Sequence, residues 1–136
     1  MKEKIRSPKV EHVAVVVAKE RNKENEIVYN VFVVNNSDEI LEGVLVSSKG
    51  YVKNQETGEM TKTSTLRHFL GIIPPHAAKL VEPIMEELFA LNNEYLVSFW
   101  KNNTLHDKKY IFLPESIQEK NLVFVPVLGV YGVVIE

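Results

Sequence analysis

The sequence of 136 residues contains no cysteine. Without a thiol, the chain cannot form a disulfide framework, a thiolate metal site or a cysteine nucleophile. It also lacks an excess of positive charge, because 16 Lys and Arg residues stand against 18 Asp and Glu residues and the formal net charge is -2. Proteins that bind nucleic-acid backbones or anionic lipid through charge are usually basic. The composition therefore does not favour a nucleic-acid partner.

Long apolar runs are missing as well. The run Val13–Ala18 ends at Lys19 after six residues, which is too short for a signal peptide. The stretch Leu122–Ile135 has 14 uncharged residues, whereas a membrane-spanning helix needs about 20, and this stretch is interrupted by Pro126 and by glycine. We therefore expect two buried strands in this stretch, no membrane association and a cytoplasmic location.

What the sequence does contain is a series of short apolar bursts, rich in valine and isoleucine and separated by polar turn clusters such as Asn35–Glu39. This pattern is typical of strands and turns. It predicts an all-β chain folded as an antiparallel two-sheet sandwich, immunoglobulin-like, with about seven to nine strands. We expect one domain over residues 1–136, with residues 1–9 as a flexible arm. Pro83 should place the strand near Ala77–Ile84 at a sheet edge, and Glu86–Leu91 is the one helical candidate.

Motifs for catalysis and metal binding are also lacking. The four histidines, His12, His68, His76 and His106, have no short spacing of the kind that zinc hydrolases use. The sequence has no glycine-rich phosphate loop and no Gly-x-Ser-x-Gly elbow. We therefore expect no metal and no cofactor, and nothing here supports an enzyme. The single tryptophan, Trp100, is expected to pack in the core.

The run Thr61–Phe69 holds the residues that best suit binding. On a regular strand Thr65 and Arg67 project from one face, whereas His68 projects from the other. In the interpretation that we favour, Arg67 lies in solvent beside a threonine ladder and His68 forms a hydrogen bond inside the sandwich. In the alternative, Arg67, Thr65 and Lys49 from a neighbouring strand bind a carboxylate or phosphate, since guanidinium groups bind such anions in a bidentate manner.

Several short motifs recur in one known group of proteins. They are Val34–Asp38, Ser48–Tyr51, Thr65–His68, Leu91–Tyr95 and Asp107–Tyr110. Together they make the chain resemble a family of small Bacteroidetes proteins that often carry the name phenylalanyl-tRNA synthetase subunit, over most of its length. A class II synthetase needs a large catalytic sheet with separate sites for ATP and amino acid, for which this chain is too short. The resemblance therefore implies an accessory role and supplies no catalytic residue.

These observations leave three hypotheses. The first is a non-catalytic binding or protein-interaction module that engages a protein or a small anionic ligand. The second is an accessory protein associated with RNA or with a synthetase, and the third is an enzyme. The apolar C-terminal region, Leu122–Ile135, adds the prediction of a two-fold homodimer. Burial between the sheets, cover by the N-terminal strand and pairing with a second copy are the three ways to protect this region from aggregation.

Overall fold

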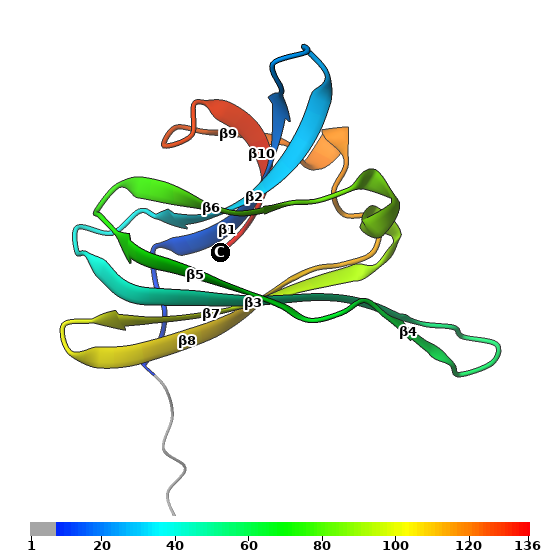
Figure 1. Ribbon diagram of the computed structural model, residues 1–136, viewed down its shortest axis with the longest axis horizontal. Coiled ribbons are helices and arrows are strands. Elements are labelled where there is room, and N and C mark those ends of the chain that lie inside the picture. The colour runs from blue at the N-terminus through cyan, green and yellow to red at the C-terminus, as the bar shows by residue number, and fades with distance from the viewer. Residues whose placement is uncertain (1–7) are drawn as a thin grey trace, which may run out of the picture.

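In the computed structural model, which describes residues 8–136, the chain forms ten antiparallel strands and two short 3-10 helices. The strands make two five-stranded sheets that stack as layers (Figure 1). The predicted all-β, antiparallel two-sheet architecture is thus confirmed. The strands outnumber the expected seven to nine because the structure adds two strands, β4 and β9, that are only three residues long. The arm predicted at residues 1–9 lies outside the described residues except for Pro8 and Lys9, which are exposed.

The first sheet has the strand order β6-β2-β1-β10-β9. Its members are β1 (Val13–Arg21), β2 (Ile27–Asn35), β6 (Ala77–Pro83), β9 (Val123–Val125) and β10 (Val130–Ile135). All neighbours in this sheet pair antiparallel. As the sequence predicts, the strand that contains Pro83 lies at an edge, where a missing N–H costs least.

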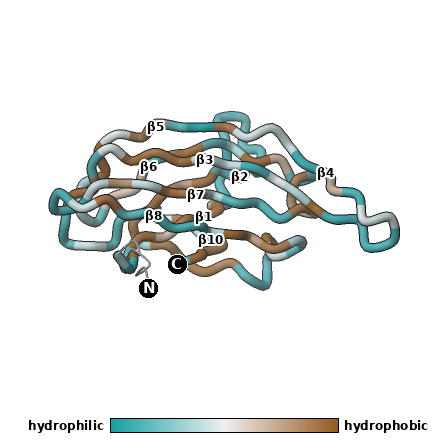
Figure 2. Tube along the Cα trace, turned by 90° about the horizontal axis from the view of Figure 1, so that it is seen from below, coloured by the Kyte–Doolittle hydropathy of each residue, from teal (hydrophilic) through white to brown (hydrophobic). Residues whose placement is uncertain are grey.

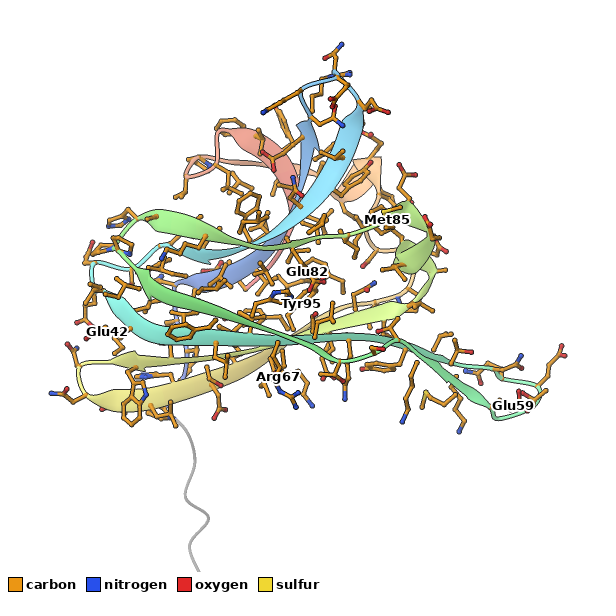
Figure 3. The ribbon with its side chains drawn as sticks, in the orientation of Figure 1. Glu42, Glu59, Arg67, Glu82, Met85 and Tyr95 are labelled. Atoms are coloured by element: carbon orange, nitrogen blue, oxygen red, sulfur yellow. The ribbon has the colours of Figure 1, made fainter. Side chains whose placement is uncertain are left out.

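The second sheet has the order β4-β3-β7-β8, and β5 also pairs with β3. Its members are β3 (Leu41–Lys53), β4 (Met60–Lys62), β5 (Leu66–Ile73), β7 (Asn92–Lys101) and β8 (Thr104–Phe112). Because β5 pairs with the first part of β3 and β4 with its last residues, these two strands share one edge and are separated by residues 63–65. The end of β3 and β4 project from the sandwich as a hairpin with Glu59 near its tip (Figure 3).

The two helical turns lie outside the sheets. The helix η1 (Glu86–Ala90) forms where the sequence predicts its helical candidate, between β6 and β7, and η2 (Glu119–Asn121) precedes β9. Neither helix in the described part of the chain is long and apolar enough to cross a membrane.

The core lies between the layers because side chains alternate along each strand. Val13, Val15 and Val17 of β1 belong to the same buried cluster as Phe99 and Tyr110 of the second sheet. Figure 2 shows how hydrophobic residues follow the strands while the tip of the hairpin beyond β4 is hydrophilic. Full burial of one such side chain contributes about 1.5–3 kcal/mol. The Tyr110 hydroxyl also donates to the Val13 carbonyl oxygen at 2.7 Å, which ties the two sheets together.

Strand β1 is buried on its other face as well. Ala14, Val16 and Ala18 form a second cluster with Val125, against which partly buried residues of the β9–β10 hairpin pack. Gly132 allows β10 to approach β1 this closely, because a Cβ at this position would lie 2.6 Å from Val16 Cγ1. Strand β1 is therefore an interior strand, and the face that the β9–β10 hairpin covers carries the small residues Ala14, Val16 and Ala18.

The C-terminal region forms the two strands that the sequence predicts, but their burial is only partial. Val133 is buried, whereas Phe124 and Tyr131 are exposed and contact each other edge to face with ring centroids 5.5 Å apart. Strand β10 lies between β1 and β9. Of the three ways to protect this region, the structure thus shows cover by the N-terminal strand. The homodimer itself stays a prediction.

Candidate functional site

The three residues predicted to bind an anion lie along one edge of the second sheet. Arg67 of β5 pairs with Ser47 of β3, and Lys49 follows two residues later on the same face of β3. Thr65 directly precedes β5, and all three are exposed. Figure 3 shows Arg67 pointing away from the other layer. The structure therefore places this set on the solvent side of the second sheet, as the favoured interpretation of Arg67 requires.

This solvent side of β5, β3, β7 and β8, which we call the outer face, carries large apolar side chains. The side chains in question are Leu45, Phe69, Leu96, Trp100 and Leu105, all exposed. Phe69 is 74 % exposed and lies opposite Leu45 in the register of β5 and β3. The prediction that Trp100 packs in the core is wrong, since its side of β7 is the outer face and it is 48 % exposed. The alternation places Phe99 inside instead.

The outer face also carries charged groups of both signs that lie side by side. The Glu94 carboxylate lies between two ammonium groups, with Lys49 Nζ 3.5 Å from Oε2 and Lys109 Nζ 3.8 Å from Oε1. Tyr51 donates to Glu94 at 3.4 Å, and burial, helped by this carboxylate, raises the pKa of the Tyr51 phenol. Lys49 is thus already paired with a carboxylate, which leaves the Arg67 guanidinium as the stronger anion-binding group of the predicted set.

A second polar cluster lies between the two sheets and centres on Glu82 of β6. Ser48 Oγ donates to Glu82 Oε1 at 2.7 Å, and His68 Nε2 lies 2.7 Å from the same oxygen. The Tyr95 hydroxyl reaches the other oxygen, Oε2, at the longer distance of 3.5 Å. Figure 3 shows Glu82 and Tyr95 facing each other between the layers. His68 therefore forms its hydrogen bond inside the sandwich, on the face opposite Arg67.

Burial sets the electrostatics of this cluster. The Glu82 side chain is 16 % exposed and that of His68 is 28 % exposed. Burial first, and then the neighbouring Glu82 carboxylate, raises the pKa of the Tyr95 phenol far above its ordinary value. Tyr95 is consequently a neutral hydrogen-bond donor at any pH at which the protein works.

The geometry of the cluster does not match nucleophilic catalysis. An activated serine needs a base that contacts its hydroxyl and a third group that orients the base. Here Ser48 and His68 both direct their hydrogen bonds to one carboxylate oxygen of Glu82. The carboxylate, rather than the imidazole, is the partner of the hydroxyl, so the serine–base hydrogen bond of an activated serine is not formed here.

A crevice of about 210 Å³ opens beside this cluster. Its walls come from residues 48–50 of β3, from the segment between β4 and β5, from β6, from η1 and from β7. Glu82 and Tyr95 lie at the inner end, and Leu66 and Leu88 supply apolar walls. Sequence reasoning missed Glu82; the available signal was a lone acid in the otherwise apolar segment Leu80–Ile84, next to a proline.

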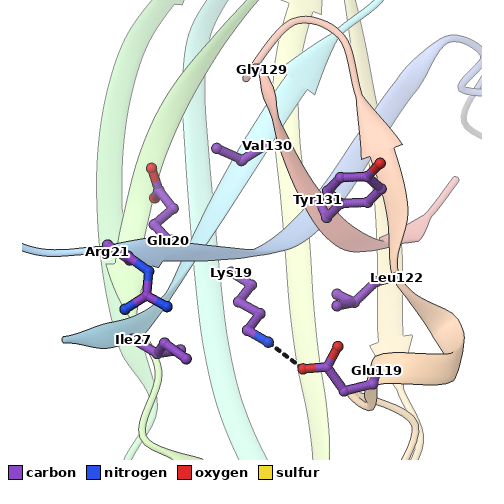
Figure 4. A pocket seen from close by; sticks show the side chains of 9 residues that line it. All are labelled: Lys19, Glu20, Arg21, Ile27, Glu119, Leu122, Gly129, Val130 and Tyr131. Carbon is purple, nitrogen blue, oxygen red and sulfur yellow. Dashed lines mark hydrogen bonds and ion pairs between the residues drawn. The ribbon is translucent and has the colours of Figure 1, made fainter. Parts of the chain in front are cut away.

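A larger hollow of about 670 Å³ lies at the other side of the molecule, between the tip of the β1–β2 hairpin and the β9–β10 hairpin (Figure 4). Its lining holds two cations, Lys19 and Arg21, and two carboxylates, Glu20 and Glu119, so its formal charge is balanced. Lys19 forms an ion pair with Glu119, and this hydrogen bond raises the pKa of the ammonium group. Arg21 donates to the Asn25 carbonyl oxygen at 2.7 Å, so both cations of the hollow already have hydrogen-bond partners. Within residues 8–136, no group of three or more His, Asp or Glu side chains is arranged to hold a metal ion.

Comparison of the chain with protein-family models, with curated proteins and with solved structures found no match.

Proposed function

We propose that the protein is a non-catalytic protein-interaction module whose outer face is the binding surface. The observation that carries this proposal is the apolar strip that contains Phe69, Leu45 and Trp100 on the solvent side of a sheet. Contiguous exposed apolar surface rimmed by polar groups is typical of protein–protein contact sites, and exposed aromatic residues supply most of the binding energy in such sites.

The charges on the outer face support an acidic group on the partner. Arg67 lies next to Phe69 in the same edge strand and is exposed. A guanidinium beside an apolar strip binds a carboxylate through two parallel hydrogen bonds. Lys49 lies on the same face of β3 as Ser47, the partner of Arg67, and Thr65 is exposed directly before β5. We propose that these three residues receive one acidic side chain of the partner protein.

A single-stranded RNA is the second candidate, because aromatic side chains on an open sheet, interleaved with cations, also stack nucleic-acid bases. Phe69 and Trp100 with Arg67 have this composition. The protein partner is favoured because Glu94 lies between Lys49 and Lys109 and neutralises much of their charge, whereas affinity for nucleic acid depends on unneutralised cations.

We also propose that the sandwich is a variant of the immunoglobulin-like architecture. Two antiparallel sheets face each other, and the chain crosses between them at β2 to β3, β5 to β6, β6 to β7 and β8 to β9. Crossings of this kind, rather than hairpins alone, are typical of immunoglobulin-like sandwiches. A measured structure aligned strand by strand with known sandwiches tests this proposal.

The functional proposal is tested with a matched pair of variants. Phe69→Ser removes the most exposed aromatic of the outer face, and Leu80→Ser, 50 % exposed on β6 of the other sheet, is its control. Both should leave the free energy of unfolding within about 0.5 kcal/mol of the wild-type value, as exposed substitutions usually do. A protein captured from native lysate should be retained by wild type and Leu80→Ser and lost with Phe69→Ser.

The same variants separate the two candidates. Binding of a fluorescent single-stranded RNA, measured by anisotropy, should be absent or equally weak for all three proteins. If instead the wild type binds this RNA in a salt-sensitive manner and Phe69→Ser does not, the RNA candidate replaces the protein partner. If the wild type and Phe69→Ser capture the same proteins, the outer face is not the binding surface.

A further inference from the structure

The two oxygens of Glu82 are used unequally, and this difference points to a ligand. Oε1 accepts from Ser48 and from His68, each at 2.7 Å. Oε2 meets only the long contact from Tyr95 at 3.5 Å among the hydrogen bonds of the described residues. Because an ionised carboxylate oxygen accepts two hydrogen bonds readily, Oε2 keeps acceptor capacity at the inner end of the crevice.

The charge of Glu82 is also incompletely balanced. A carboxylate that is 16 % exposed needs a cation or several strong donors nearby, since burial penalises its charged form. Ser48 and Tyr95 are neutral donors, and His68 balances the charge only while its imidazole is protonated. Lys49 lines the mouth of the crevice, but its ammonium lies beside Glu94 on the outer face. Whenever His68 is neutral, the crevice therefore holds an unbalanced negative charge.

We propose that the crevice binds a cationic group, an alkylammonium or a guanidinium on a short apolar stem, with Glu82 Oε2 as the main acceptor. The volume of about 210 Å³ suits a group the size of one side chain. Leu66 and Leu88 would contact the stem, and Ser64 lies near the mouth. Such a group occurs both in free small amines and in lysine or arginine side chains of a polypeptide. The site is distinct from the outer face, because Ser48 and Glu82 lie on the opposite side of β3, and Lys49 is the one residue of the outer-face set that also lines the described crevice.

The test uses the full chain and two probes of nearly equal shape. The probes are n-propylammonium and its neutral isostere n-propanol, both titrated at about pH 8, well below the pKa of an alkylammonium group. Backbone amide NMR shifts report binding. We expect saturable shifts around the crevice with the ammonium and none with the alcohol. A dipeptide with a C-terminal lysine then distinguishes a polypeptide side chain from a free amine by its relative affinity.

Glu82→Gln should weaken binding of the ammonium at least about tenfold, because a charge-assisted hydrogen bond is lost. Its control is Glu119→Gln, which removes a carboxylate from the larger hollow, away from the crevice, and should leave the affinity unchanged. Leu66→Trp places a larger side chain at an exposed position in the wall of the crevice and should also weaken binding of the ammonium. This variant replaces Glu82→Gln in the test if Glu82→Gln fails to fold.

Three results would overturn the proposal. The first is the absence of saturable shifts up to about 100 mM n-propylammonium, a concentration far above the dissociation constants of ordinary small-ligand sites. The second is equal binding of n-propanol and n-propylammonium. The third is equal affinity of the wild type, Glu82→Gln and Leu66→Trp for the ammonium. None of them affects the outer face, which is tested with Phe69→Ser.

Discussion

Arg67 and His68 are adjacent in β5 and offer a sharp test of how the second sheet is oriented. Arg67→Ala removes an exposed side chain that points away from the core. His68→Ala removes the imidazole that lies 2.7 Å from Glu82 between the sheets. If Arg67 lies on the solvent side of β5 and His68 lies between the sheets, the two alanine substitutions should change the free energy of unfolding by very different amounts.

The expected magnitudes follow from the contacts. A hydrogen bond to a charged group is worth about 1.5–3 kcal/mol, and its loss leaves the partner less well satisfied. Because the side chains of His68 and Glu82 are 28 % and 16 % exposed, water replaces part of this interaction. We therefore expect His68→Ala to lower the free energy of unfolding by about 1–2.5 kcal/mol. For Arg67→Ala the expected change is under about 0.5 kcal/mol.

Urea unfolding followed by Trp100 fluorescence or by circular dichroism measures both changes. With a slope of about 2 kcal/mol per M urea, His68→Ala should move the midpoint by about 0.5–1.2 M and Arg67→Ala by less than about 0.3 M. A double-mutant cycle of His68→Ala with Glu82→Gln should give a coupling energy of at least about 0.5 kcal/mol. Equal large losses from the two single variants, or a coupling energy near zero, would refute the orientation of β5.

Three further predictions concern other parts of the fold. Gly132→Ala should destabilise it by about 1–3 kcal/mol in urea unfolding, because the new Cβ would lie 2.9 Å from a backbone carbonyl of β1, whereas Gly50→Ala, which meets only side-chain ends at 3.1 Å and 3.2 Å, should cost less. The free energy of unfolding should fall as pH rises above about 10, because unfolded tyrosines ionise there while burial holds the pKa of Tyr95 and Tyr110 higher in the folded chain; an ultraviolet titration should show both phenols ionising only on unfolding. If light scattering finds a homodimer through the C-terminal region, Phe124→Lys, at an exposed position of the edge strand β9, should return it to monomers without unfolding the subunit.

Local patterns in the sequence were sufficient for much of the fold. Alternation along β5 placed Arg67 and His68 on opposite faces, and Pro83 marked an edge strand, because both effects act within one strand. Alternation along β7 also showed which residues share a face with Trp100. It could not show which of the two faces another sheet covers, since this depends on strands far away in the sequence, and Trp100 was placed inside in error.

The Glu82 cluster could not be predicted for a related reason. Ser48 and Glu82 are separated by 34 residues, and His68 and Glu82 by 14. They meet because β3 and β5 pair in one sheet while β6 lies in the other, and no spacing rule relates residues that converge in this way. The same limit applies to the outer face, whose apolar strip combines β5, β3, β7 and β8 through their register.

The position of the Glu82 cluster explains how a ligand could enter without opening the sandwich. Strands β5 and β6 are each paired with one strand of their own sheet, so both have a free edge on the same side of the molecule. Two polar links join them across the layers, His68 to Glu82 and Lys79 Nζ to the Leu70 carbonyl oxygen at 2.9 Å. Only the first of these links involves Glu82, and it uses Oε1, so that Oε2 keeps no short hydrogen bond among the described residues. A cation that binds Oε2 therefore leaves the bonds between the sheets in place, and its binding should add to the stability of the fold by mass action.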